Sequence, residues 1–561
     1  MENLFCNDLA QRYADISCHE KQRWQELKSN NIQTWVDIWE QSVDKNSTAY
    51  VLQDVSTSQS WTYRALDQEA DKIAHWAAST HEEYIGVCIA NCSTFLTVVI
   101  GLIKAGVVPV LFNIREPSSK LSRLANQSQV RFGLGQEIPG VKSFDPSHLL
   151  SGSHPGRLSP IYRCEKKLTD PAVIIFTSGT SGRSKPALFS HLRLIGAGIA
   201  WSIRTGITAN SRCYIPLPLY HGNGLAIGFA SCIESGACAV VRECFSVRAF
   251  LPDIRKYECD AAVYIGELWR YLMNSARLPG DANNPLKIIY GNGLTSQIWN
   301  SVLERFGIEH VVEHYGASEM PGSALTNWTG QSGYCGFIPP DHPDATDILL
   351  VDEQGKPVAK NKPGQALFRV SSGKYRGYLD PKMDEDRLWK NLLEADDLWW
   401  KSGDLLTLNT EGFYKFVDRI GDSFRWKGEN VATLEVEEAL LDLEQVSEAV
   451  VYGISISGHS GKVGMASILP KEPMDPNHLM STVMSQLIQQ LPRYAIPHFI
   501  RLTTVPHQTT STLKTRKAQL IEDGFQKIDL CPHYVLSQGK YIFLTHDHLE
   551  KIDSENFTLG F

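Results

Sequence analysis

A glycine- and hydroxyl-rich loop at residues 176–185 is the segment of this sequence with the clearest capacity for chemistry. It follows the apolar run 172–176 and leads toward a longer mixed segment that begins near His191. Backbone N–H groups and hydroxyls in such a loop can bind phosphate oxygens, and a lysine adds positive charge. We therefore expect a strand, a triphosphate-binding loop and then a helix. The phosphate-binding candidates are Thr177, Ser178, Gly179, Thr180, Ser181, Gly182 and Lys185.

The spacing of this loop differs from that of the common nucleotide-binding loop. That loop reads G-x-x-x-x-G-K-[ST], and residues 176–185 do not fit the pattern. A lone run of serine, threonine and glycine is more often a solvated turn. The phosphate interpretation therefore depends on what else the chain contains.

The segment 315–319, Tyr-Gly-Ala-Ser-Glu, directly follows an apolar strand and offers three useful groups. The ring of Tyr315 can cover a base, and the hydroxyl of Ser318 can meet a phosphate. The carboxylate of Glu319 can hold Mg²⁺ against phosphate oxygens. Alone, the pentapeptide would be read as a turn at the end of a strand.

Three later segments add polar groups of the same kind. In 401–404, Asp404 can accept hydrogen bonds from both hydroxyls of a ribose. The stretch 418–430 is rich in charge and glycine. Near the C-terminus, the hydroxyl-rich loop 510–514 ends in Lys514, which outside such a loop would be read as a solvated surface lysine.

The elements around these segments predict an α/β fold with a large multi-lobed N-terminal domain. Apolar strands and amphipathic helices alternate to about residue 320, which favours parallel sheets flanked by helices. Short strands and turns between about 348 and 418 predict a β-rich lobe. A helix at 431–443 and a strand at 448–452 indicate a small α+β domain. The expected strands are 84–91, 212–216, 237–242, 261–265, 286–290 and 308–313, and the expected domains are 1–418 and a mobile 419–561.

Composition excludes several classes of function. The 561 residues carry a formal net charge of -8, so no basic excess exists to neutralise the phosphates of a nucleic acid. The 12 cysteines form no C-x-x-C pair, which speaks against zinc and a disulfide framework and favours a reducing compartment.

No targeting or membrane-spanning segment is predicted. The N-terminal residues lack a basic region followed by an apolar core. The most apolar stretch, 94–113, is interrupted by Lys104, Gly106 and Pro109, so we expect a buried helix and a buried strand there. The expectation is a cytoplasmic protein, soluble or peripheral, with contact to a membrane surface and the oligomeric state left open.

In this order, the loop and the four later segments resemble the motifs of the acyl-adenylate-forming superfamily of acyl-CoA synthetases, luciferases and peptide-synthetase adenylation domains. The fatty-acid transport protein and very-long-chain acyl-CoA synthetase branch is closer still. The residues that carry this closer resemblance are Tyr220-His221-Gly222-Asn223-Gly224, 264–272, Gly291-Asn292-Gly293-Leu294, 424–430 and 522–525. It extends over roughly residues 35 to 550.

The resemblance implies an ATP-dependent ligase with Mg²⁺ and coenzyme A as further reactants. A hydrophobic carboxylic acid, foremost a fatty acid, would attack the α-phosphate of ATP and release pyrophosphate. The thiol of coenzyme A would then displace AMP from the acyl-adenylate. Adenylation supplies a leaving group that a free carboxylate lacks, and the protein contributes positioning and charge stabilisation.

Roles carry over from the resemblance residue by residue. The loop from Thr177 to Lys185 would wrap the β- and γ-phosphates, Ser318 would bind the α-phosphate, and Glu319 would hold Mg²⁺. Lys514 would bridge the substrate carboxylate and the α-phosphate as negative charge develops. The remaining nucleotide contacts would come from Tyr315, Gly316, Gly291, Asn292, Gly293, Asp404 and Arg419.

Three further positions concern the acyl group and the thiol. His221 would orient the acyl group or gate its pocket, although a purely structural histidine explains the residue equally well. Lys427 and Gly428 would border the path of the coenzyme A thiol after the C-terminal domain rotates. The pivot would lie at 420–421, where a glycine suits a hinge.

The sequence departs from the branch at several positions. Ser181 and Ser318 stand where threonine is usual, and both keep the hydroxyl. Ser511 and Leu513 replace glycine and phenylalanine in the terminal motif, which keeps its lysine. Met320 stands where glycine is common and is expected to shape the acyl pocket.

Other functions remain open. The acyl group could pass to a carrier protein instead of coenzyme A, or the acid could be carnitine-like or aromatic. A non-catalytic lipid-binding protein is the alternative from a different class. The polar set Lys185, Glu319, Asp404, Arg419 and Lys514 argues against that alternative.

Overall fold

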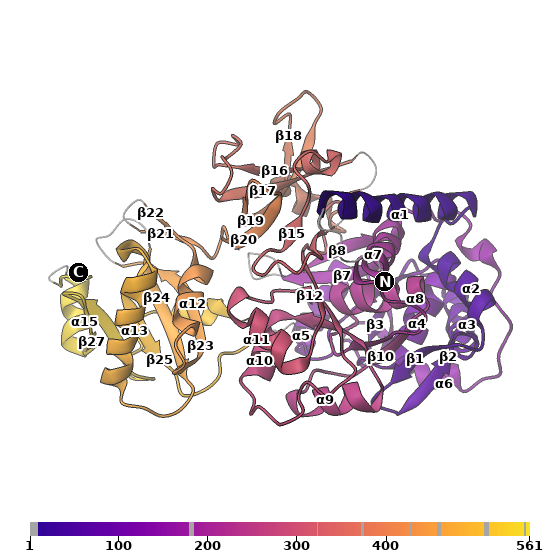
Figure 1. Cartoon of the computed structure of the whole chain (residues 1–561). Coiled ribbons are helices and arrows are strands. Elements are labelled where there is room, and N and C mark those ends of the chain that lie inside the picture. The colour runs from indigo at the N-terminus through magenta and orange to yellow at the C-terminus, as the bar shows by residue number, and fades with distance from the viewer. Residues whose placement is uncertain are drawn as a thin grey trace. The chain divides into compact units, whose positions relative to one another are not determined.

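The chain forms two compact units, each described here by itself. The computed structural model describes residues 9–178, 184–322, 324–371, 375–426, 429–456, 462–509, 515–554 and 557–560. The first unit comprises Met1–Leu349, Leu367–Ser402 and Asn409–Tyr414, and the second comprises Leu350–Ala366, Gly403–Leu408 and Lys415–Phe561. Figure 1 shows the first unit mainly in indigo to red and the second mainly in orange to yellow.

The first unit contains an eight-stranded sheet of order β14-β13-β12-β11-β9-β10-β1-β2. Its central neighbours are parallel, whereas β1–β2 and β13–β14 are antiparallel. Most of its strand residues are buried and apolar, as strands covered on both faces should be. Its strands are β1 (Tyr50–Asp54), β2 (Gln59–Thr62), β9 (Arg212–Ile215), β10 (Cys238–Val241), β11 (Ala261–Ile265), β12 (Ile288–Asn292), β13 (His310–Tyr315) and β14 (Leu325–Asn327).

A six-stranded sheet of order β6-β5-β3-β4-β7-β8 lies in the same unit. All its neighbours are parallel except the last pair, in which β8 returns antiparallel to β7. Its strands are β3 (Tyr84–Cys88), β4 (Val108–Leu111), β5 (Phe132–Gly135), β6 (Lys142–Phe144), β7 (Pro171–Ser178) and β8 (Ser184–Ser190).

Helices cover these sheets, and α7 and α8 pack against each other beside the eight-stranded sheet (Figure 1). The helices are α1 (Leu9–Ser29), α2 (Trp35–Asn46), α3 (Tyr63–Thr80), α4 (Ser93–Lys104), α5 (Ser118–Gln127), α6 (Pro146–Leu150), α7 (His191–Thr205), α8 (Ala230–Ser235), α9 (Val247–Lys256), α10 (Gly266–Met273) and α11 (Ser296–Phe306). Short 3₁₀ turns are η1 (Pro160–Arg163), η3 (Pro343–Asp347) and η4 (Pro381–Arg387), and η2 (Asn223–Phe229) is a π-helix.

The expected α/β fold is confirmed. Each of the six strands expected between residues 84 and 313 has a counterpart, from β3 to β13, with ends shifted by a few residues. The apolar stretch 94–113 is the buried helix α4 followed by the buried strand β4. Among the described residues, no helix is both long and apolar enough to cross a membrane.

The sequence predicts a strand, the loop and then a helix near His191, and α7 indeed begins at His191. The strand β8, between the loop and this helix, was not predicted. Pro186 cannot donate the backbone hydrogen bond of a helix interior, and Ser190 caps α7 through its side chain. The strands on either side of the loop, β7 and β8, are paired antiparallel.

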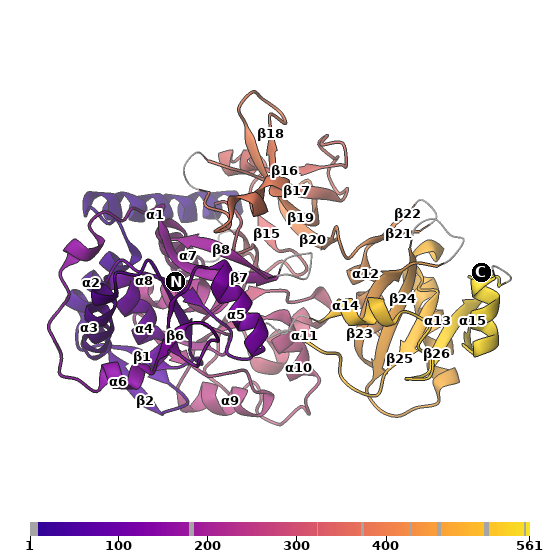
Figure 2. The ribbon, with the colours of Figure 1, turned by 180° about the vertical axis from the view of Figure 1, so that it is seen from behind.

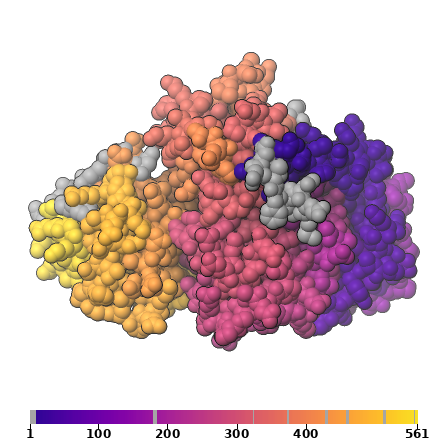
Figure 3. Space-filling view, viewed as in Figure 1, coloured from indigo at the N-terminus to yellow at the C-terminus, as the bar shows by residue number. Residues whose placement is uncertain are grey.

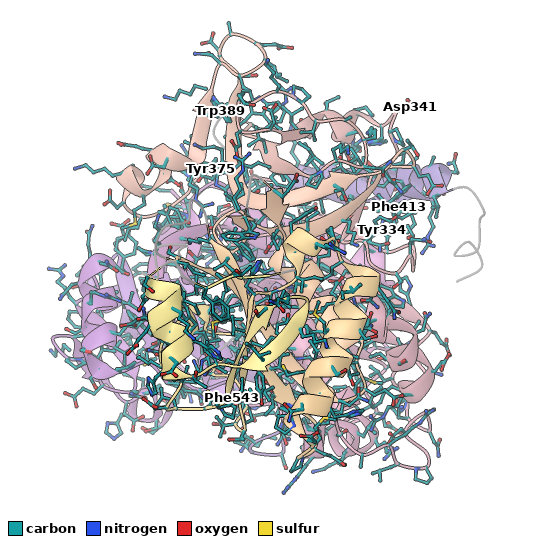
Figure 4. The ribbon with its side chains drawn as sticks, turned by 90° about the vertical axis from the view of Figure 1, so that its left-hand side faces the viewer. Tyr334, Asp341, Tyr375, Trp389, Phe413 and Phe543 are labelled. Atoms are coloured by element: carbon teal, nitrogen blue, oxygen red, sulfur yellow. The ribbon has the colours of Figure 1, made fainter. Side chains whose placement is uncertain are left out.

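A third sheet has the order β15-β20-β19-β17-β16, with β18 paired to β19. The chain passes between the two units within β16, β17, β19 and β20. In the first unit, the rings of Tyr334 and Phe413 lie 5.0 Å apart beside this sheet (Figure 4). The strands are β15 (Gly336–Phe337), β16 (Ile348–Val351), β17 (Gly364–Arg369), β18 (Leu388–Lys390), β19 (Leu398–Leu408) and β20 (Phe413–Arg419).

The second unit has its own core, built on a five-stranded sheet of order β23-β24-β25-β26-β27. Figure 2 shows the helices of this unit around that sheet. The elements are β21 (Phe424–Trp426), β22 (Glu429–Val431), α12 (Thr433–Leu441), β23 (Val446–Ile454), β24 (Val463–Pro470), α13 (Pro476–Gln490), η5 (Arg493–Ala495), β25 (Phe499–Leu502), α14 (Lys517–Asp523), β26 (His533–Ser537), β27 (Lys540–Phe543) and α15 (His546–Asp553). The predicted domain boundary at residues 418 and 419 stays a prediction.

Candidate active site

The β7–β8 hairpin places Thr177 opposite Lys185, on either side of the phosphate-loop candidates. Gly179, Thr180, Ser181 and Gly182 lie outside the described residues, as does the side chain of Ser178. The Thr177 hydroxyl oxygen is buried and has no hydrogen-bond partner in the part of the chain that the structure describes. An orphaned buried hydroxyl beside a lysine suits a ligand rich in oxygen, such as a phosphate.

Residues 377–379 pair with the middle of β8 and place Tyr378 beside this hairpin. Tyr378 forms a bridge with Ala187, and the N–H of Leu379 donates to the carbonyl of Pro186 at 2.9 Å. The Tyr378 hydroxyl donates to Oε1 of Glu319 at 2.9 Å, and Lys185 Nζ lies 5.0 Å from the centre of the Tyr378 ring. Lys185 and Glu319, which the sequence proposed for the same ligand, therefore surround one tyrosine.

The sequence analysis did not identify Tyr378 because a tyrosine in a short turn carries no chemical signature. Its contact with Glu319 joins residues 59 positions apart. Burial, followed by the charge of Glu319, raises the pKa of Tyr378, so its hydroxyl stays protonated and remains a donor.

Arg193 on α7 is a second residue that the sequence did not point to. Its guanidinium donates to the carbonyl of Ala317 at 2.9 Å and to the carbonyl of Ser318. Burial lowers the pKa of Arg193 to about 10, which still leaves it charged at neutral pH, and Glu319 opposes that shift. The guanidinium thus fixes the turn that carries Ser318 and Glu319.

Tyr315 ends β13 with its ring packed against Phe368. The ring centres are 6.0 Å apart and the planes are inclined by 15°, which is a stacked arrangement. Only 8% of Tyr315 is exposed. The next residue, Gly316, lies so close to Ala324 that an added Cβ would stand 3.1 Å from the alanine Cβ. The backbone at 315–316 is therefore closely packed.

The turn at 291–293 ends the neighbouring strand β12 and depends on glycine. A Cβ on Gly291 would stand 2.0 Å from the carbonyl oxygen of Tyr264, and Gly293 has a φ of +86°. On β13, Nδ1 of His314 lies 2.6 Å from the carbonyl oxygen of Gly291. Gly291 and Gly293 can therefore hold this backbone path only without side chains.

Glu313 braces the same turn from inside the protein. It accepts hydrogen bonds from the hydroxyl of Tyr264 and from the N–H groups of Gly293 and Leu294. Burial raises the pKa of Glu313 to about 8, and these hydrogen bonds act in the opposite direction. The sequence showed Glu313 only as the end of an apolar strand.

The motif at 220–224 lies next to Ser318 and next to Asn292. An added Cβ on Gly222 would stand 4.0 Å from Oγ of Ser318. Nδ2 of Asn223 donates to Oδ1 of Asn292 at 2.7 Å. The rings of Tyr220 and His221 lie 4.7 Å apart. The structure thus brings the predicted acyl-group motif beside the predicted phosphate and adenine residues.

In the second unit, Asp404 and Arg419 form an ion pair, with Nε and Oδ1 3.5 Å apart. Burial raises the pKa of the adjacent Asp418 to about 6, although its carboxylate accepts from the N–H of Thr433 at 2.5 Å. Ile420 donates its N–H to the carbonyl of Gly403 at 2.9 Å. Lys427, Gly428 and Lys514 lie outside the described residues.

Glu319 is the only protein ligand predicted for the metal. No cluster of three or more metal-ligating His, Cys, Asp or Glu side chains occurs among the described residues. Mg²⁺ is commonly held by one or two carboxylates together with phosphates and water, so a single glutamate beside a phosphate loop fits that ion.

Comparison with known proteins agrees with the motifs. The model of the AMP-binding enzyme family matches residues 39–379, and that of the AMP-binding enzyme C-terminal domain matches 435–512. Long-chain fatty acid transport protein 6 of Homo sapiens is 32% identical over 88% of this chain and 86% of its own. Long-chain fatty acid transport protein 5 of Mus musculus is 37% identical over 73% of this chain and 61% of its own.

Solved structures confirm the fold. The o-succinylbenzoate coenzyme A synthetase of Bacillus subtilis, in complex with ATP and magnesium ion, superposes with a TM-score of 0.73. It is 20% identical, and the match covers 88% of this chain and 99% of that chain. The superfamily and branch resemblance predicted from the motifs is thereby confirmed, and this chain belongs to the AMP-binding enzyme family, in the branch of the long-chain fatty acid transport proteins.

Proposed function

We propose that this chain is an AMP-forming fatty acid–coenzyme A ligase for long- or very-long-chain acids. A carboxylate oxygen bonds to the α-phosphorus of ATP, and the bond to the bridging oxygen breaks to release pyrophosphate. The sulfur of coenzyme A then bonds to the acyl carbon, AMP leaves with its new oxygen, and the thiol proton is lost. The observation that carries the proposal is the meeting of Lys185 and Glu319 around Tyr378, beside the orphaned hydroxyl of Thr177.

The roles of the phosphate-binding residues follow from this reaction. Thr177, Lys185 and the loop between them bind the β- and γ-phosphates and stabilise charge on departing pyrophosphate. Ser318 binds the α-phosphate, on a turn that Arg193 holds in place. Glu319 holds Mg²⁺, which neutralises phosphate charge when it is bound.

The remaining residues orient the nucleoside, the acyl group and the thiol of coenzyme A. Tyr315 and the turn at 291–293 enclose adenine, while Asp404 and Arg419 bind the ribose. Lys514 stabilises charge between the carboxylate and the α-phosphate during adenylation. His221 orients the acyl group, and Lys427 and Gly428 border the path of the thiol.

The choice of a long acyl chain rests on the named relatives and on apolar residues near the reacting groups. The π-helix η2 follows His221 and carries a buried apolar run from Leu225 to Phe229. Met320, next to Glu319, is 2% exposed. Buried apolar side chains that follow His221 and Glu319 in the sequence favour a hydrocarbon chain over a polar acid.

Two further parts of the proposal concern organisation and location. The domain that bears Lys427, Gly428 and Lys514 begins at residue 419. It rotates about residues 420–421 between the adenylation step and the thioester-forming step. The protein acts in the cytoplasm, a reducing compartment in which its cysteines stay as thiols. In the part of the chain that the structure describes, every cysteine is free.

Pyrophosphate release tests the proposal. ATP and Mg²⁺ would be incubated with short, long and very long fatty acids and with aromatic and betaine acids, each with and without coenzyme A. Sustained release with long acids that requires coenzyme A is the expected result. A single burst would indicate a carrier-protein acceptor, and turnover with another acid class would reassign the substrate. The absence of release with every acid would support the non-catalytic alternative.

A further inference from the structure

Tyr378 occupies a position that none of the predicted functional roles explains. It is 1% exposed, and its hydroxyl and ring contact residues from two separate motifs. The hydroxyl donates to Glu319, and the ring faces Lys185. A side chain between the proposed metal ligand and the proposed phosphate-binding lysine can determine how far apart those two charges lie.

The main chain around Tyr378 is fixed on both sides. Toward β8, it bridges to Ala187, and its neighbours Gly377 and Leu379 exchange backbone hydrogen bonds of 2.9 Å with Leu188 and Pro186. Away from β8, the N–H of Tyr378 donates to Oδ2 of Asp384 at 3.0 Å. The hydroxyl therefore projects from a rigid backbone that is paired to the strand carrying Lys185.

We propose that Tyr378 is a positioning residue for adenylation, which holds the Glu319 carboxylate and the Lys185 ammonium group in register for magnesium-bound ATP. This assignment rests on the proposed function. Partners that hydrogen-bond to a metal ligand fix its orientation, and their loss commonly weakens metal binding by about 10- to 100-fold. Without the hydroxyl, one Glu319 oxygen loses the donor that directs it.

Tyr375 supplies a matched control in the same segment (Figure 4). Its hydroxyl also donates to a carboxylate, but that carboxylate is Asp384, at 2.6 Å. Tyr375→Phe therefore removes a comparable hydrogen bond to Asp384, which keeps the N–H of Tyr378 as a donor, and leaves the contact between Tyr378 and Glu319 in place. Tyr378→Phe removes the hydroxyl and keeps the ring that faces Lys185.

The test is calorimetric binding of two nucleotides to the full chain. One is α,β-methylene ATP, titrated at a series of Mg²⁺ concentrations, and the other is AMP. Tyr378→Phe should weaken magnesium-dependent binding of the ATP analogue by about tenfold and leave AMP binding unchanged. Tyr375→Phe should change neither. Equal loss for both nucleotides, or no loss for the ATP analogue, would overturn the assignment.

A second variant tests the same contact from its other partner. Glu319→Gln should lower the magnesium dependence with Tyr378 intact, and adding Tyr378→Phe should cause little further loss, because both changes interrupt one contact. Additive losses would contradict the proposal. A wild-type chain that bound neither nucleotide would overturn the proposed function itself, which separates that failure from a failure of Tyr378 alone.

Discussion

Glu313 and Gly293 are joined by a hydrogen bond from the glycine N–H to the buried carboxyl group, across 20 residues of sequence. Leu294 donates to the same carboxyl group through its N–H, and Tyr264 donates through its hydroxyl. One side chain on β13 therefore holds the turn at the end of β12. Because Tyr315 ends β13, the two proposed contacts with adenine are fixed by adjacent strands.

This relationship predicts how stability depends on pH. The pKa of Glu313 is about 8 in the folded protein, above the usual value of 4.5. The folded state therefore binds more protons than the unfolded state between these two values, and stability falls as pH rises through that interval. Glu313→Gln keeps a neutral hydrogen-bonding side chain at this position but removes the ionisable carboxyl group.

Denaturant unfolding of the wild type and Glu313→Gln from about pH 5 to about pH 9 measures this effect. The wild type should lose stability relative to the variant by up to about 1.4 kcal/mol per pH unit between the two pKa values, and the loss should level off above the folded pKa. A constant difference between the two proteins over that range would show that Glu313 keeps one protonation state.

The close approach at Gly291 predicts the outcome of adding one methyl group. A Cβ there would stand 2.0 Å from the backbone oxygen of Tyr264, so Gly291→Ala must displace β11 or the turn. We expect about 1–3 kcal/mol of destabilisation and weaker binding of AMP.

Gly152 provides the control for this substitution. An added Cβ on Gly152 has nothing within 4 Å, and Gly152→Ala should leave both stability and AMP binding unchanged. Thermal unfolding and AMP titration of both variants check the prediction. If a folded Gly291→Ala protein bound AMP with wild-type affinity, the turn at 291–293 would not be part of the nucleotide site.

Lys514→Ala should separate the two half-reactions. In the proposed mechanism, the lysine stabilises charge only while the carboxylate attacks ATP, so acyl-AMP formation should fall by about 10²- to 10³-fold. Conversion of supplied acyl-AMP to acyl-coenzyme A should continue near the wild-type rate. Single-turnover assays of each step make the comparison, and equal loss in both would refute the separate role of Lys514.

Gly428→Trp should produce the opposite pattern. A large side chain beside the thiol path should block thioester formation, while one equivalent of pyrophosphate is still released from ATP. Rapid-quench measurement of pyrophosphate and acyl-coenzyme A distinguishes the two steps. Unimpaired overall turnover would show that the thiol follows another path.

Local patterns in the sequence predicted much of the fold. Buried parallel strands such as β3 and β11 appear as short apolar runs between helical segments, which is why their positions could be read directly. Helix α1 was not predicted. Only two of its described residues, Ser17 and Leu27, are buried, so it has no apolar stripe that the sequence would reveal. Its side chains form ion pairs instead, such as Arg23 with Glu234 at 2.5 Å, and Figure 3 shows α1 in indigo on the surface of the first unit.

The candidate site was predictable only where a motif is continuous along the chain. Residues 315–319 and 291–293 could be identified because their types and order carry the chemistry. Tyr378, Arg193 and Glu313 act through contacts across 59, 125 and 20 residues. Such contacts depend on strand pairing and helix packing, which local composition does not determine.

The most direct test of the central claim follows the oxygen atoms of the fatty acid. Palmitic acid and behenic acid, each labelled in the carboxylate with heavy oxygen, would be converted with ATP, Mg²⁺ and coenzyme A. Mass spectrometry should find one labelled oxygen in AMP, one in the acyl-coenzyme A and none in pyrophosphate. Label in a released phosphate, or unlabelled AMP beside acyl-coenzyme A, would contradict an acyl-adenylate intermediate.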